Sequence, residues 1–449
     1  MELHGKTVLV IGLKRTGVSV ARFVASQGGQ VRVTDRQGHD ALTPELASLA
    51  GIPLDLHLGT NDLDVLARVD LVVPSPGVPA NAPLLQAAAR QGVPVWSEIE
   101  LAFRFLPCPL LAVTGTNGKS TTTTLLGEIL RQSGRRVFVG GNLGTPLIEA
   151  VAGNSEVAVA EVSSFQLEWV EQFRPHIGLW LNLSEDHLDR HTSFAVYGRT
   201  KRALLARQKP TDWAVVNRDD PEVWARTHEL PGRVFSFGWT PVSEGTWIDT
   251  GTLIVRHDGQ EARYALDRVQ LHGRHNLENV MAAVSAATLW DVAQEVISSV
   301  LATFSGLPHR LQLVTKKHGV SYFDDSKGTN VGAVLQSLAS FTGPVILLAG
   351  GVDKGGDYSP LRPLVRAKVK KLIVFGQARE TIRAALGQET ETVVVDTLPE
   401  AVQAAVAGAT AGDTVLLSPA CASFDQFENY AHRGHVFRAC VEALWRAGC

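Results

Sequence analysis

The sequence has few cysteines, no long apolar run and no excess of charge of one sign. Only four of the 449 residues are cysteines, and no two of them have the C-x-x-C spacing of zinc or redox sites. They are Cys108, Cys421, Cys440 and Cys449. So few scattered cysteines argue against a disulfide framework and indicate free thiols. We therefore expect a cytoplasmic protein.

The balance of charge argues against polyanionic partners. The chain has 42 basic and 45 acidic side chains, a net charge of -3, so no global field favours nucleic acid or an anionic membrane. No apolar segment reaches transmembrane length, and the first residues lack the basic start and long apolar middle of a signal peptide. We expect small-molecule substrates, no nucleic acid, no membrane insertion and a monomer.

The length predicts several domains, because 449 residues exceed the size at which one hydrophobic core keeps growing. Short apolar runs alternate with helix-like stretches, which is typical of α/β folds with mainly parallel sheets. We expect a Rossmann-like domain at 1–98, a central domain of the P-loop ATPase type at 99–304 and a Rossmann-like domain at 305–449.

The individual strands are expected at the apolar runs. They lie at 7–11, 31–34, 71–73 and 93–95, then at 110–113, 137–139, 157–160, 177–181 and 213–216, and finally at 320–323, 345–348, 372–375, 392–395 and 414–417. The turn-rich alternation between 239 and 271 predicts antiparallel hairpins inserted in the central domain.

A glycine-rich loop is the clearest chemical signal. Residues 113–120 (VTGTNGKS) follow an apolar strand and precede a helix, where backbone N–H groups hold polyphosphate. Lys119 would neutralise the outer phosphates, and the Ser120 hydroxyl would bind Mg2+. Glu161 ends another apolar run and is a candidate metal ligand. The alternatives are an ordinary capped glycine turn and a solvated acid, and Val113 replaces the first glycine of GxxxxGK[ST].

Residues 114–121 (TGTNGKST) resemble the phosphate loop of the Mur ligases and of the related folylpolyglutamate synthetases. The resemblance implies an ATP site formed by Gly115, Thr116, Asn117, Gly118, Lys119, Ser120 and Thr121. Residues 161–167 (EVSSFQL) and 182–189 (NLSEDHLD) resemble the family's metal motifs, which implies that Glu161 and His187 bind Mg2+. His191 follows His187 at i+4 without an HExxH pattern, so we expect it to be structural or solvent-facing.

Two further segments carry the resemblance into the rest of the middle domain. Residues 197–201 (YGRTK) resemble the segment whose lysine is carbamylated by CO2, which implies that Lys201 supports a second Mg2+. Without the family, Lys201 belongs to an exposed basic patch. Residues 273–279 (GRHNLEN) resemble GxHNxxN, which implies that Asn276 holds the adenine, although a plain helix N-cap explains it equally well.

The third domain continues the resemblance. By it, Arg310 in the segment 308–310 (PHR) reaches ATP, whereas the alternative is an ordinary surface arginine. Residues 324–330 (DDSKGTN) resemble the family's DSKATN segment. This implies that Asp325 lies near the ATP ribose and that Lys327 faces the transferred phosphate.

Residues 418–427 (SPACASFDQF) resemble the D-glutamate-adding members of the family, and the DNPR motif of diaminopimelate- or lysine-adding members is absent from the sequence. The resemblance implies that D-glutamate contacts Thr329, Lys354, Ser423 and Tyr430. Tyr430 stands where this subgroup usually has phenylalanine, so its hydroxyl needs a partner if it is buried.

The first domain resembles a nucleotide-binding fold. Residues 12–17 (GLKRTG), followed by Asp35, resemble a dinucleotide fingerprint, but Lys14 replaces the central glycine, which argues against NAD. The family resemblance implies instead that the UDP part of the substrate binds here. The implied contacts are Arg15, Thr16, Asp35, Arg36, Ser75, Gly77 and Asn142. Lys14 either contacts the pyrophosphate or is solvated, and we favour solvation.

The implied activity is an ATP-dependent ligase that adds D-glutamate to UDP-N-acetylmuramoyl-L-alanine through an acyl phosphate, giving ADP and phosphate, in peptidoglycan precursor synthesis. The implied catalytic groups are Lys119, His187, Lys201 and Lys327, with ATP and two Mg2+ ions. Three alternatives stay open: a nucleotide-binding regulator, a nicotinamide-dependent oxidoreductase and a folylpolyglutamate synthetase.

Overall fold

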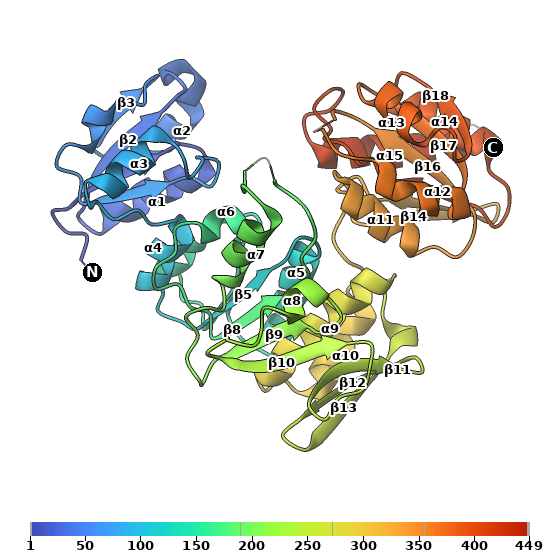
Figure 1. The fold of residues 1–449 in the computed structure, drawn as a ribbon, viewed down its shortest axis with the longest axis horizontal. Helices are drawn as coiled ribbons and strands as arrows, with labels where there is room; N and C mark the ends of the chain where they lie inside the picture. Colours follow the sequence, from blue (N-terminus) through green and yellow to red (C-terminus); the bar gives the residue numbers. More distant parts are fainter. Residues whose placement is uncertain (1, 189, 272, 354, 447–449) are drawn as a thin grey trace. The chain divides into compact units, whose positions relative to one another are not determined.

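The computed structural model describes residues 2–188, 190–271, 273–353 and 355–446, which form two compact units. The first unit contains the residues up to Asp267 together with Asn279–Val300, and the second contains Arg268–Glu278 and the residues from Leu301 onward. Helices alternate with mainly parallel strands in both units (Figure 1). This confirms the predicted α/β fold.

The first unit begins with a four-stranded parallel sheet in the order β3-β2-β1-β4. Its elements are β1 (Thr7–Ile11), α1 (Arg15–Ser26), β2 (Gln30–Asp35), η1 (His39–Leu42), α2 (Thr43–Ala47), β3 (Leu54–Leu58), η2 (Leu63–Leu66), β4 (Leu71–Pro74) and α3 (Pro83–Arg90). The strand predicted at 93–95 is wrong, because only Val95 pairs, in a single bridge with Val72. Pro94 has no N–H to donate, so a ladder cannot continue through it.

The second sheet of this unit has nine strands in the order β13-β12-β11-β10-β9-β8-β5-β7-β6. Its strands are β5 (Leu110–Thr114), β6 (Val137–Gly141), β7 (Val157–Glu161), β8 (Ile177–Trp180), β9 (Trp213–Asn217), β10 (Arg233–Gly238), β11 (Gly245–Asp249), β12 (Thr252–His257) and β13 (Gln260–Ala265). β5 and β7 are buried along their whole length, as expected for parallel strands covered on both faces. The antiparallel pairs β11–β12 and β12–β13 confirm the predicted hairpins.

Helices surround this sheet. They are α4 (Glu98–Phe105), α5 (Lys119–Gln132), η3 (Leu147–Ala152), α6 (Ser164–Leu167), α7 (Phe194–Arg202), α8 (Pro221–Trp224), η4 (Leu266–Arg268), α9 (Arg274–Leu289) and α10 (Gln294–Thr303). Helix α9 is divided between the two units. Its residues up to Glu278 belong to the second unit, and those from Asn279 onward belong to the first unit.

The second unit contains a six-stranded sheet in the order β14-β15-β19-β16-β17-β18, parallel except for the edge pair β14–β15. Its strands are β14 (Gln312–Lys317), β15 (Val320–Asp324), β16 (Val345–Gly350), β17 (Val369–Phe375), β18 (Glu391–Val394) and β19 (Thr414–Leu417). Its helices are α11 (Val331–Ala339), η5 (Ser359–Leu361), α12 (Arg362–Lys368), α13 (Arg379–Leu386), α14 (Leu398–Gly408) and α15 (Tyr430–Arg446).

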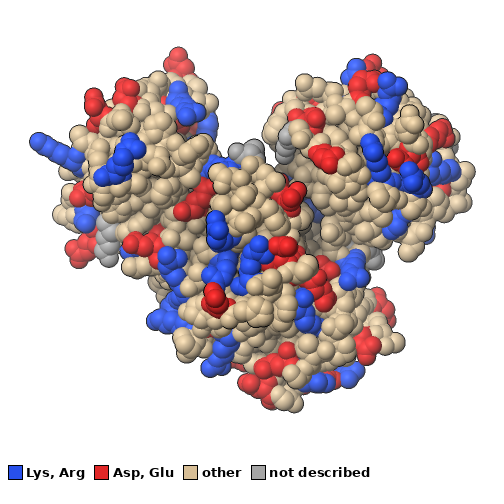
Figure 2. Space-filling view, viewed as in Figure 1, with Lys and Arg blue, Asp and Glu red and all other residues tan. Residues whose placement is uncertain are grey.

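Each parallel sheet brings the carboxyl ends of its strands to one edge, where ligands bind in open α/β folds. In the nine-stranded sheet, β5 lies between β8 and β7, so the loop after β5 is flanked by the ends of both neighbours. No helix in the described ranges has the length and apolar character that a bilayer crossing requires. On the face seen in Figure 2, basic and acidic side chains are mixed over the surface.

Candidate active site

The glycine loop lies between β5 and α5, with two of its glycines in left-handed backbone conformations. Gly115 has φ +152° and Gly118 has φ +84°, a region that side chains other than glycine rarely adopt. A Cβ on Gly118 would lie 2.0 Å from Oδ1 of Asn279 on α9. Glycine is therefore required at this position by both conformation and space.

The loop is braced by Asn182, which follows the neighbouring strand β8. The Asn117 amide donates to Oδ1 of Asn182 at 2.8 Å, and Nδ2 of Asn182 donates to the Asn117 carbonyl at 3.1 Å. The Thr116 amide donates to the Asn182 carbonyl at 3.2 Å. These bonds leave the loop with a defined shape.

Asn182 and Asn279 were not predicted as site residues. Both belong to the motif segments noted above, 182–189 and 273–279, but only the fold brings them to the loop. The available signal was the position of Asn182 directly after an apolar run next to the glycine loop's strand.

Two lysines converge on the Gly115 carbonyl. Nζ of Lys119 donates to the carbonyls of Gly115 and Thr116 at 2.9 and 2.8 Å, and Nζ of Lys201 donates to the Gly115 carbonyl at 2.8 Å. Lys201 is 1% exposed, which contradicts the alternative of an exposed basic patch. Burial, followed by the nearby positive charge of Lys119, holds the pKa of Lys201 well below its usual value.

Ser120 and Glu161 lie together at the predicted metal site. Oγ of Ser120 donates to Oε2 of Glu161 at 2.5 Å, and Nδ2 of Asn142 donates to Oε1 at 2.7 Å. Glu161 ends β7 and is 4% exposed. The buried carboxylate and the hydroxyl contact each other, and both are hard oxygen donors of the kind that Mg2+ prefers. Asn142, predicted at the UDP site, has its side chain on this carboxylate.

The two histidines of the metal motif have different environments. The His187 side chain is 48% exposed, its Nε2 lies 3.7 Å from Oδ2 of Asp186, and its ring packs edge-on against Phe165. His191 is 3% exposed, and its Nε2 lies 3.0 Å from Oγ of Ser164. Burial lowers the pKa of His191. His191 is therefore structural, one of the two roles expected for it.

The second unit positions the acid Asp325. Oδ2 of Asp325 accepts hydrogen bonds from Ser337 Oγ at 2.6 Å and Ser418 Oγ at 2.7 Å, and Oδ1 accepts from the Leu311 amide at 3.2 Å. Burial raises the pKa of Asp325 to about 6, while these donors and the charge of Arg310 oppose the rise. Ser418 opens the segment that resembles the D-glutamate-adding members.

Lys327 and Tyr430 meet in the same unit. Nζ of Lys327 lies 3.9 Å from the centroid of the Tyr430 ring, within the range of a cation–π interaction. The Thr329 amide donates to the Lys327 carbonyl at 2.8 Å, and Ser423 is 2% exposed. Lys354, also predicted to contact D-glutamate, lies outside the described residues. The structure thus joins a predicted phosphate-facing residue to a predicted amino-acid contact.

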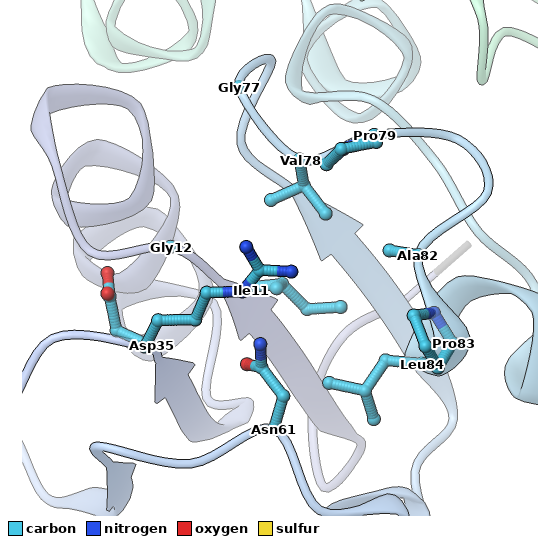
Figure 3. Close-up of a pocket in the computed structure, with 11 residues that line it drawn as sticks. Ile11, Gly12, Asp35, Asn61, Gly77, Val78, Pro79, Ala82, Pro83 and Leu84 are labelled. Carbon is cyan, nitrogen blue, oxygen red and sulfur yellow. The ribbon is translucent and has the colours of Figure 1, made fainter.

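A pocket in the first domain gathers three of the predicted UDP contacts. It is lined by Ile11, Gly12, Asp35, Arg36, Asn61, Gly77, Val78, Pro79, Ala82, Pro83 and Leu84. Figure 3 shows Asp35 beside Gly12 on one side, with Val78 and Leu84 among the apolar side chains. The Asp35 carboxylate accepts from the amides of Leu13 and Gln37, each at 2.8 Å.

The remaining first-domain residues lie around the loop after β1. Oγ of Ser75 donates to the Gly12 carbonyl at 2.8 Å, and Nη1 of Arg15 donates to the Gly144 carbonyl at 2.8 Å, while Thr16 lies in the first turn of α1. Arg15 thereby connects this loop to the segment after β6. Nζ of Lys14 pairs with Glu45 at 2.9 Å and its side chain is 57% exposed, so Lys14 is a surface residue.

Asn276 lies at the start of α9, where its amide donates to the Gly273 carbonyl at 3.1 Å, and it is 7% exposed. Its motif partner Asn279 contacts the phosphate loop, as described above. The motif therefore contributes to the loop through its second asparagine, whereas the role of Asn276 stays a prediction.

Three family models match successive parts of the chain. They are described as "Mur ligase MurD-like, N-terminal domain" at residues 6–97, "Mur ligase middle domain" at 113–287 and "Mur ligase, glutamate ligase domain" at 309–421. Together they span most of the three sheets described above.

Curated relatives match over the full length. The UDP-N-acetylmuramoylalanine–D-glutamate ligase of Geobacter metallireducens is 46% identical over 99% of both chains. The enzyme of the same name from Geotalea daltonii is 47% identical over 100% of both.

Solved structures share the fold at lower identity. A pseudomurein peptide ligase type C from Methanothermus fervidus is 21% identical, with a TM-score of 0.61 over 98% of this chain and 100% of that one. MurF ligase from Thermotoga maritima, in complex with ADP, is 16% identical, with a TM-score of 0.60 over 92% and 96%. The chain is 46 and 47% identical to curated Mur ligases over its full length, and three Mur ligase domain models match it in order. This chain therefore belongs to the Mur ligase family.

Proposed function

We propose that this chain is the ATP-dependent ligase that joins D-glutamate to UDP-N-acetylmuramoyl-L-alanine in peptidoglycan precursor synthesis. The observation that carries the proposal is the meeting of Lys119, Ser120, Glu161 and Lys201 around the loop after β5. Relatives of the same length at 46 and 47% identity bear that enzyme's name. We place the UDP-substrate domain at 1–98, the ATP domain at 99–304 and the amino-acid domain at 305–449.

The reaction has two steps. A carboxylate oxygen of the alanyl group attacks the γ-phosphorus of ATP, the bond to the bridging oxygen breaks, and ADP leaves. The amine of D-glutamate then attacks the acyl carbon, the carbon–nitrogen bond forms, phosphate leaves, and the amine loses its proton. Since charge moves between phosphate oxygens in the first step, positioned cations are the main requirement for catalysis.

The chain's residues fit that requirement. We assign ATP phosphates to the backbone of Gly115, Thr116, Asn117 and Gly118 and to the side chain of Lys119, with Thr121 continuing the loop into α5. We assign Mg2+ to Ser120, Glu161 and His187, which would hold the ion, and the ion would supply positive charge beside the phosphates. Asn276, Arg310 and Asp325 are assigned to the nucleotide, and Lys327 to the transferred phosphoryl group.

Lys201 is proposed to carry a carbamate that supports a second Mg2+. The neutral amine attacks the carbon of CO2, a nitrogen–carbon bond forms, and a proton leaves, so that a base becomes an anion. The full burial of the side chain, its bond to Gly115 and the nearby charge of Lys119 all favour the uncharged amine that this reaction needs.

The substrates are assigned to the ends of the chain. Arg15, Thr16, Asp35, Arg36, Ser75, Gly77 and Asn142 are proposed to contact the UDP part. Thr329, Lys354, Ser423 and Tyr430 are proposed to contact D-glutamate. We propose that the enzyme acts as a monomer in the cytoplasm.

The test is phosphate release from ATP and Mg2+ in the presence of UDP-N-acetylmuramoyl-L-alanine, with D-glutamate, L-glutamate, L-lysine or no amino acid. Release that requires both substrates and only D-glutamate is the expected result. Release with another amino acid would assign the chain to a different Mur ligase activity. The absence of release would favour a nucleotide-binding regulator. Lys119→Met should abolish release, whereas Lys316→Met, at an exposed position of β14, should not.

A further inference from the structure

Arg433, in the first turn of α15, is a fully buried arginine that lies outside the sequence motifs described above. It is 0% exposed. Its guanidinium makes six hydrogen bonds, five to backbone carbonyls and one to the hydroxyl of Ser326. Burial lowers the pKa of Arg433 to about 10, so the side chain stays charged at neutral pH.

These bonds join the loops after β15 and β19 to Gly350, the last residue of β16 before its loop. Nε donates to Ser326 Oγ at 2.9 Å and Nη2 to the Ser326 carbonyl at 2.8 Å. Nη1 donates to the carbonyls of Gly350, Cys421 and Ala422 at 3.3, 3.2 and 3.3 Å, and Nη2 also reaches the Cys421 carbonyl at 3.2 Å. The loops follow β15, β16 and β19, which are adjacent strands in the order β15-β19-β16.

The three loops also contact one another. The amides of Val352 and Ala422 each donate to the other residue's carbonyl, at 2.8 and 3.1 Å, and the Ala420 amide donates to the Gly328 carbonyl at 2.9 Å. A Cβ on Gly351 would lie 2.0 Å from the Ala422 carbonyl oxygen, so the two loops approach too closely for a side chain at this position. Arg433 lies where all three loops meet.

Each loop carries a residue assigned to the reaction or stands next to one. The first carries Asp325 and Lys327, the third carries Ser423, and the second precedes Lys354 in the sequence. The first turn of α15 also contacts Lys327 through Tyr430. The Tyr430 carbonyl accepts a hydrogen bond from Ser326 Oγ at 2.8 Å, and the Tyr430 ring packs against the Lys327 ammonium.

We infer that Arg433 is a positioning residue that holds the loops after β15, β16 and β19 in one arrangement, which presents Ser423 to the incoming amino acid and Lys327 to the transferred phosphoryl group. The inference rests on the proposed D-glutamate ligation. A planar guanidinium with its donors in a fixed fork satisfies carbonyls from three directions at once. A lysine ammonium has fewer donors and cannot span the same three loops.

The experiment compares the full-length wild type with Arg433→Lys, Ser326→Ala and Arg438→Met. Arg438 is the matched control, since it lies one turn further along α15 and bonds Gln312 of β14 instead of the loops. Ser326→Ala removes one acceptor of Arg433 while leaving the guanidinium in place, and it decides the question if Arg433→Lys does not fold. Backbone hydrogen exchange without substrates and steady-state kinetics are the two readouts.

Arg433→Lys should increase exchange at 325–330, 350–353 and 418–423 together, by about tenfold, with a smaller increase in Ser326→Ala and none in Arg438→Met. It should raise KM for D-glutamate about tenfold or more and lower kcat, while KM for the UDP substrate stays within about twofold. A purely structural role would reduce the active fraction and leave KM for D-glutamate unchanged.

Unchanged exchange in the three loops, or a loss of total activity with an unchanged KM for D-glutamate, would overturn the inference. If the wild type itself shows no D-glutamate-dependent phosphate release, the proposed function fails. The exchange measurement then still decides whether Arg433 orders the loops.

Discussion

Oγ of Ser120 donates a 2.5 Å hydrogen bond to Oε2 of Glu161. The residue after the phosphate-loop lysine therefore contacts the acid that ends β7. Ser120 lies in the first turn of α5, the helix that follows β5, and β5 pairs with β7 with Val113 beside Glu161. Two hard oxygen donors at one point fit Mg2+ better than a softer metal.

Glu161→Gln should therefore shift the Mg2+ dependence of phosphate release to higher concentrations. The amide preserves the shape but removes the charge, and catalytic efficiency with MgATP should fall about 100-fold or more. Glu156→Gln is the control, since Glu156 precedes the same strand at an exposed position and pairs with Arg136. Superimposable Mg2+ curves for Glu161→Gln and wild type would remove Glu161 from the metal site.

Lys201→Arg should lose activity by about 100-fold or more, because a guanidinium keeps its charge and does not react with CO2 as a neutral amine does. In protein incubated with 13C-bicarbonate, 13C NMR should show a carbamate carbon in the wild type and lose it in Lys201→Arg. Lys209→Arg, at an exposed position, should retain both the signal and the activity. A carbamate signal that persists in Lys201→Arg would assign the modification elsewhere.

Gly118→Ala should weaken nucleotide binding about tenfold or more and cost roughly 1–3 kcal/mol of stability, because a Cβ there strains the backbone and displaces Asn279. Gly134→Ala is matched to it, with φ +87° and nothing within 4 Å of the added Cβ. That control should lose about 1 kcal/mol and no nucleotide affinity. Calorimetric titration with ADP and chemical denaturation measure the two effects, and equal affinities in both variants would contradict the assigned geometry.

Asp325→Asn should change the pH dependence of stability. The folded-state pKa of about 6 exceeds the ordinary value of 3.8, so the folded protein binds more protons than the unfolded chain between these values. The free energy of unfolding of the wild type relative to Asp325→Asn should therefore fall as pH rises through that window, by on the order of 3 kcal/mol, and level off above it. Denaturation at several pH values measures this, and parallel curves for the two proteins would show that burial does not penalise the charge.

Tyr430→Phe should leave KM for D-glutamate within about twofold, because the ring, which lies 3.9 Å from Lys327 Nζ, is retained. Tyr430→Leu removes the ring, and the loss of about 1 kcal/mol of cation–π attraction should raise KM about fivefold. Steady-state kinetics with varied D-glutamate separate the cases. A large effect of Tyr430→Phe would instead assign the contact to the hydroxyl.

Most strands could be predicted, including the edge strands β4, β6 and β18, and the clearest of them lie inside a sheet. β5, β7 and β16 are continuous apolar runs, because helices cover both faces of the sheet. The local sequence alone therefore predicts that these strands are buried. The interior strand β10 was not predicted, and neither were the outer strands β3 and β14. β3 and β14 are edge strands with many exposed side chains, and their sequences, LDLHL and QLVTKK, carry too little hydrophobic pattern to be distinguished from loops.

The positions of the glycine loop and of Glu161 follow from the sequence, because a loop that follows a strand and the acid that ends one are local features. The burial of Lys201 does not, because its local sequence is that of an exposed basic patch, whereas its side chain is 1% exposed. Which distant groups complete the phosphate loop and the acidic sites depends on the three-dimensional fold. Asn279 reaches Gly118 from far along the chain, Ser418 reaches Asp325, and Arg433 ties three loops together. These contacts depend on strand order, in which β5 lies between β8 and β7, and β19 lies between β15 and β16. That order is set by long-range pairing and core packing, and no local pattern of residues encodes it.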